Sequence, residues 1–117
     1  MKILRIYTGD DGESHFGEMD VALEPAVDVG LLSKLYPVRG IIFRETPGTY
    51  DLDFHNAPRR QFVINLRGGV EIVVGDGSRR RIGPGEMFLA EDTQGRGHIS
   101  RAIDNQPRTS VLVTLED

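Results

Sequence analysis

Glycine and proline turns recur along this chain at intervals too short for helices and suited to short strands. Of its 117 residues, 14 are glycine and 6 are proline. In the second half they separate short apolar runs, as at Gly68-Gly69, Gly75-Asp76-Gly77 and Gly83-Pro84-Gly85. Short strands divided by such turns are typical of a β-sandwich or a β-barrel. The spacing therefore predicts an all-β fold.

The length allows one domain over residues 1–117, with roughly eight to eleven strands if it closes into a barrel. Residues 23–37 are expected to form a surface loop with at most one helical turn, because Pro25, Gly30 and Pro37 interrupt them. The expected strands are 1–8, 14–21, 38–44, 61–67, 70–74, 79–82, 86–90, 98–103 and 109–115.

Composition narrows the classes of function. The chain has no cysteine, which excludes disulfides, thiolate metal sites and a cysteine nucleophile, and a reducing cytoplasm is the expected compartment. Its formal net charge of −4 disfavours nucleic acid as a partner. No apolar run approaches the length of a membrane span, and the first residues do not resemble a secretory signal, so no membrane partner is expected.

Two segments resemble the two sequence motifs of the cupin superfamily, which are small jelly-roll barrels. The first runs from Gly48 to Gly68 and contains His55 and Gln61. The second runs from the Gly83-Pro84-Gly85 turn to His98. The resemblance implies a single jelly-roll barrel. It implies little about the reaction, because one fold hosts many chemistries.

The same resemblance suggests a metal site that departs from the usual pattern. His55 and His98 match the first and third of the three histidines of the family, whereas Ala57 stands at the position of the second and Gln61 replaces the carboxylate. His55, Gln61 and His98 are thus the candidate ligands for one divalent ion, Zn²⁺, Fe²⁺, Mn²⁺ or Ni²⁺. The alternative is a metal-free barrel in which these groups bond one another and water. His15 is either a third imidazole or a surface residue.

Further candidates for binding a small ligand are Arg59, Asn65, Tyr50 and Glu91. Arg59 has the same strand parity as Gln61, and a guanidinium matches a carboxylate or phosphate; the alternative is a surface salt bridge. Asn65 shares the face of Gln61, and Tyr50 stands close to His55 in sequence. Glu91 and Asp92 are adjacent, so at most one faces the site, as a base or an extra ligand, and the alternative is a turn.

Alternation on strand 61–67 also predicts an interface. If Gln61 points inward, then Phe62, Ile64 and Leu66 point outward. Each apolar side chain of this kind is stabilised by about 1.5–3 kcal/mol when it is buried. Strand 2–8, from the same chain or from a partner, is the expected cover. Cupins often pair in this way, so the resemblance also implies a homodimer.

The sequence is compatible with three functions. The first is a metal-dependent cupin enzyme of isomerase, lyase or hydrolase type that acts on a small polar or acidic molecule. The second is a metal-free module that binds a sugar or a carboxylate without catalysis. The third is a structural barrel that serves through its dimer interface. The sequence does not select a catalytic residue among the candidates.

Overall fold

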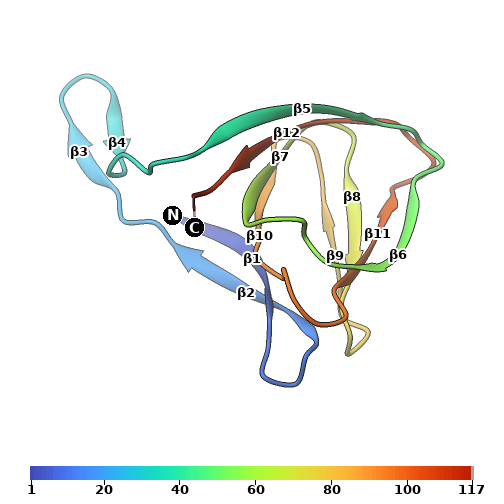
Figure 1. Ribbon diagram of the computed structural model, residues 1–117. Coiled ribbons are helices and arrows are strands. Elements are labelled where there is room, and N and C mark those ends of the chain that lie inside the picture. The colour runs from blue at the N-terminus through green and yellow to red at the C-terminus, as the bar shows by residue number, and fades with distance from the viewer. Residues whose placement is uncertain (117) are drawn as a thin grey trace.

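The computed structural model describes residues 1–116, and these form three β-sheets (Figure 1). The strands of the six-stranded sheet, in spatial order, are Ser14–Asp20 (β2), Lys2–Thr8 (β1), Met87–Ala90 (β10), Gln61–Arg67 (β7), Arg108–Thr114 (β12) and Gly40–Thr46 (β5). Those of the four-stranded sheet are Asp51–His55 (β6), His98–Ala102 (β11), Val70–Val73 (β8) and Arg79–Ile82 (β9). A separate hairpin joins Glu24–Ala26 (β3) to Gly30–Leu32 (β4).

The core lies between the inner faces of the two larger sheets. Along β7, Gln61, Val63 and Asn65 are buried, and the residues between them are more exposed, as alternation predicts. Val63 packs with Phe88 of β10 and Leu112 of β12 from the six-stranded sheet, and with side chains of β8 from the facing sheet. Every ladder between neighbouring strands is antiparallel except that of β1 with β10.

The prediction of an all-β jelly roll is confirmed. The strands expected at 61–67 and 79–82 have the predicted bounds, and the other expected strands differ by one or two residues at an end. Within the barrel, strand β6 was not predicted. Strand β6 is poor in apolar residues, because it pairs on one side with β11 and exposes Asp51, Leu52 and Asp53.

Residues 23–37 were expected to be a loop with at most one helical turn, and this is corrected by the β3–β4 hairpin. Its turn uses two residues with positive φ, Asp28 at 68° and Gly30 at 93°. The hairpin projects away from the barrel (Figure 1). Its apolar side chains are exposed, with Val27 89% accessible. Within residues 1–116 no helix is long and apolar enough to cross a membrane.

The outer face of the six-stranded sheet remains partly uncovered. Strand β1 does not lie over Phe62, Ile64 and Leu66, as the sequence suggested, because it pairs with β10 inside the same sheet. Phe62 instead borders a surface groove with Tyr36. The register places Ile64 and Phe43 on either side of Val111 in one row, and Phe43 is 77% exposed.

This outer face leads us to expect a homodimer. Burying such a row of side chains against a second copy removes apolar area from water, worth about 25 cal/mol per Å². Sedimentation velocity at micromolar concentration should give a dimer for the natural chain. Phe43→Asp should give a folded monomer whose melting temperature no longer depends on protein concentration. Arg80→Glu, on the exposed β9 strand, is the control and should stay dimeric. A natural chain that sediments as a monomer at that concentration would contradict the expectation.

Candidate functional site

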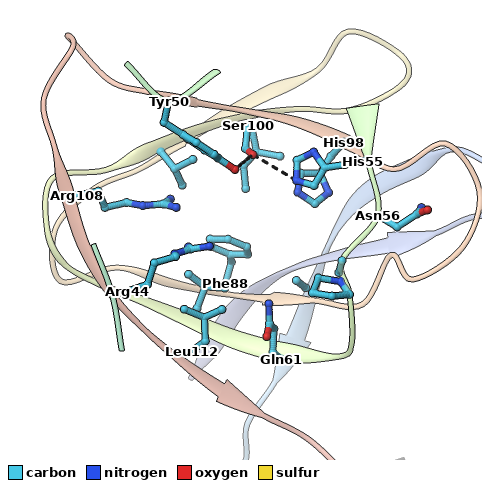
Figure 2. A pocket seen from close by; sticks show the side chains of 16 residues that line it. Arg44, Tyr50, His55, Asn56, Gln61, Phe88, His98, Ser100, Arg108 and Leu112 are labelled. Carbon is cyan, nitrogen blue, oxygen red and sulfur yellow. Dashed lines mark hydrogen bonds between the residues drawn. The ribbon is translucent and has the colours of Figure 1, made fainter. Parts of the chain in front are cut away.

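A cavity of about 170 Å³ with polar and apolar walls lies inside the barrel, between the two sheets (Figure 2). Both sheets contribute to its wall, so the jelly roll itself creates the site. The polar side chains that line it are Arg44, Tyr50, His55, Asn56, Gln61, His98, Ser100 and Arg108. The apolar part of the wall consists of Ala57, Pro58, Val63, Val70, Ile72, Phe88, Ala90 and Leu112.

His55 and His98 lie side by side in this cavity. They face each other across the antiparallel pair β6–β11, and their ring centroids are 4.5 Å apart. Gly97 makes this approach possible. It has φ +83°, and a Cβ atom at this position would come within 1.9 Å of the His55 carbonyl oxygen. Any other residue at 97 would therefore push apart the two strands that carry the histidines.

A buried carboxylate holds His98 in place. Asp92 follows β10 and is fully inaccessible, and its Oδ2 atom is hydrogen-bonded to Nδ1 of His98. Ser14 of β2 donates its hydroxyl to the same oxygen at 2.6 Å. Because Nδ1–H of His98 donates to a carboxylate, the lone pair of this ring in its neutral form is on Nε2. His98 itself is 6% exposed.

His55 has a different environment. Its Nδ1–H donates to the carbonyl oxygen of Asp53 at 2.8 Å, so Nε2 is an acceptor in the neutral ring. Nε2 lies 3.5 Å from Oγ of Ser100, which in turn lies 2.6 Å from the hydroxyl of Tyr50. Burial lowers the pKa of His55 below its usual range, and the neighbouring His98 lowers it further. These groups form a short hydrogen-bonded chain from Tyr50 to His55.

Two arginines line the same cavity as the histidines (Figure 2). Arg44 of β5 donates from Nε to the hydroxyl of Ser110 at 3.1 Å. Arg108 of β12 is 5% exposed, and its Nε atom has no hydrogen-bond partner within residues 1–116. Burial, together with the nearby Arg44, lowers the pKa of Arg108 to about 10, so it remains charged at neutral pH. In the described part of the chain, neither arginine has a carboxylate within salt-bridge distance.

Most of the residues proposed from the sequence reach this cavity or its edge. His55, Gln61, His98 and Tyr50 all line it. Arg59 is beside it and donates from Nη1 to Oε1 of Gln61 at 3.2 Å.

Asn65 and Glu91 belong to other parts of the structure. Asn65 points inward, but it is fully buried away from the cavity and donates to the carbonyl of Ile82 at 3.0 Å. Glu91 lies on the outer side, where it forms ion pairs with Arg5 and Arg60. The two carboxylates 91 and 92 do point opposite ways, and Asp92 is the one that points inward.

His15 also lies outside the cavity. Its Nε2 atom is paired with the carboxylate of Asp11. Sequence reasoning missed Arg44 and Arg108 entirely. Their only signal was a positive charge at an inward position of two apolar strands. Reading that signal requires the register of β5 with β12, in which Arg44 pairs with Ser110 and Arg108 with Thr46.

The predicted ligand set is a poor fit for a resident metal ion. No group of three or more histidine, cysteine or acidic side chains within residues 1–116 is placed to hold a metal. The carboxylate of Asp92 is engaged with Nδ1 of His98, and the amide oxygen of Gln61 accepts from the Arg59 cation. Protein metal sites usually supply three or four ligands, and two guanidinium cations in the same cavity oppose a further cation.

Comparison with known proteins supports the fold and gives no function. No family model matches the chain, and no curated protein matches it. A conserved protein of unknown function from Streptococcus pyogenes has a similar structure, with a TM-score of 0.51 and 19% identity over 73% of this chain and 71% of that one. The protein NMB1881 from Neisseria meningitidis has a TM-score of 0.53 and 18% identity over 71% of this chain and 88% of its own.

The environments of His55 and His15 predict opposite effects of pH on the free energy of unfolding. The folded pKa of His55 is lowered, so its contribution to stability is present above the ordinary value near 6.5 and is lost as pH falls through the folded pKa. Replacing His55 by Gln should therefore make the unfolding free energy fall less on acidification from pH 7.5 to 5. The pKa of His15 is raised by Asp11, so His15→Gln should make that free energy fall more. Denaturant titrations at several pH values measure both, and equal pH dependence in the three proteins would contradict the assignment.

Proposed function

We propose that this chain is a small cupin-like protein that binds a small organic acid inside its barrel, without a metal ion. The single observation that carries the proposal is the pair Arg44 and Arg108, two cations in one interior cavity with no carboxylate partner in the described chain. Removing a charge from water is costly unless an opposite charge or hydrogen bonds compensate it. A bound carboxylate would supply both.

The chemistry of the two side chains supports an anion over a neutral polar ligand. A guanidinium presents a planar fork of N–H donors that matches a carboxylate, and such charge-assisted bonds are about twice as strong as neutral ones. Arg108 lines the cavity, and its buried Nε–H has no hydrogen-bond partner within residues 1–116. Gln61, Tyr50 and the histidines add polar groups for the other end of the molecule.

The volume of the cavity supports a small ligand. At about 170 Å³ it is below the 300–1,000 Å³ typical of sites for drug-sized molecules. The apolar walls formed by Phe88, Val63 and Leu112 favour a short carbon skeleton between the polar ends. A two- to four-carbon acid fits this description, about the size of pyruvate or malonate.

Calorimetric titration with acids and their neutral amides tests the proposal. Pyruvate or malonate should bind, and pyruvamide or malonamide should bind far more weakly. Arg108→Met should weaken acid binding about 10- to 100-fold, because a hydrogen bond to a charged group contributes about 1.5–3 kcal/mol. Arg101→Gln, an exposed residue paired with Asp51, is the matched control and should bind like the natural chain.

Thermal stability gives an independent readout of the same variant. Without ligand, Arg108→Met should raise the melting temperature, since it removes a buried charge that faces the ring of Tyr50 at 5.7 Å but has no carboxylate partner in the described chain. Added acid should raise the melting temperature of the natural chain by more than that of the variant at the same concentration. Equal binding of acid and amide, or acid binding unaffected by the loss of Arg108, would contradict the proposed function.

A further inference from the structure

Asp92 is a buried acidic group that the proposed binding of an organic acid does not require. It is fully inaccessible, and its side chain contacts only Ser14 and His98 among the polar groups of residues 1–116. A carboxylate in such a position costs stability unless it is well paired. The hydrogen bond to Asp92 fixes the ring of His98. The lone pair on Nε2 is then the one that the ring can offer to a molecule in the cavity.

We infer that His98 is a general base that removes a proton from the carbon next to the oxo group of a bound 2-oxo acid. The inference rests on the proposed function, because Arg44 and Arg108 would hold the carboxylate of that acid. The histidines and the arginines line one small cavity, so an acid held by the arginines has the rest of its skeleton near the imidazoles (Figure 2).

The proton balance of this step is simple. The C–H bond breaks, its proton moves to Nε2 of His98, and its electron pair stays on the substrate as an enolate. The imidazolium that forms is stabilised by Asp92, which is already bonded to Nδ1. The enolate oxygen would accept hydrogen bonds from the donors of the cavity, the two guanidinium groups and the hydroxyl of Tyr50. Return of a proton to the same carbon completes an exchange, and its delivery to another atom completes an isomerisation.

His55 is less suited to this role than its neighbour. Its Nδ1–H donates to the neutral carbonyl of Asp53, so no carboxylate is hydrogen-bonded to its ring as Asp92 is to that of His98. Burial and the nearby His98 also disfavour that form. The side chains that face His98 are Asp92 and His55 at contact distance, with Tyr50, Arg44 and Arg108 lining the rest of the cavity. Asp92 acts through His98, and is therefore a positioning residue.

Exchange of protons at C3 of 2-oxobutyrate, followed by proton NMR in D₂O, tests the inference with the full chain in excess EDTA. The natural chain should accelerate exchange above buffer. Positioned general bases contribute about 10²–10⁴-fold, so His98→Gln should lose at least 100-fold while still binding the acid. Imidazole added to His98→Gly should restore part of the rate. Asp92→Asn should lower the rate at saturating acid with little change in its Kd.

Two controls separate this inference from the proposed function. His15→Gln changes a surface histidine outside the cavity and should keep the full rate. Arg108→Met should weaken binding and slow exchange together at a subsaturating acid concentration. Acid binding without exchange above buffer would overturn the inference and leave the proposed function standing. So would full exchange by His98→Gln, or exchange that EDTA abolishes and zinc restores. Failure of pyruvate, 2-oxobutyrate and malonate alike to bind would overturn both.

Discussion

The charge of Arg108 inside the barrel is the constraint on which the proposed binding site depends. A guanidinium that is 5% exposed and lacks a partner for Nε is unfavourable in an isolated chain. It lies on β12, the strand that joins β7 to β5, so the barrel cannot form without enclosing it. A ligand that carries a negative charge removes this cost, and in doing so couples the stability of the fold to occupancy of the site.

The two sheets bring opposite chemistry to the cavity. The six-stranded sheet contributes the two arginines from adjacent strands, whereas the four-stranded sheet contributes the two histidines from β6 and β11. The histidine pair depends on the backbone contact at Gly97, and His98 further depends on Asp92, which follows β10 of the other sheet. The hydrogen bonds of Asp92 thus connect the two layers as well as orienting the ring.

Local pattern predicted much of this fold, and its limits are physical. Turns at Gly68-Gly69 and Gly83-Pro84-Gly85 set the strand positions, and alternation correctly placed Gln61, Val63 and Asn65 on one buried face. Alternation does not give depth along the barrel, so it did not separate Gln61, which reaches the cavity, from Asn65, which bonds to Ile82. Alternation also could not show that Arg44 and Arg108 line one cavity, because strands so distant in sequence become neighbours only through the topology. The β3–β4 hairpin escaped because its apolar residues are exposed and show no alternation of burial.

The most direct test of the central claim is the ¹⁵N NMR signal of the Arg108 Nε–H group, assigned by its loss in Arg108→Met. Saturating malonate should shift this signal and slow the exchange of the Nε–H proton with water, because the group gains a charged acceptor. The signal of the exposed Arg101 should not move. A titration that shifts Arg101 and leaves Arg108 unchanged would place the anion on the surface and contradict the account.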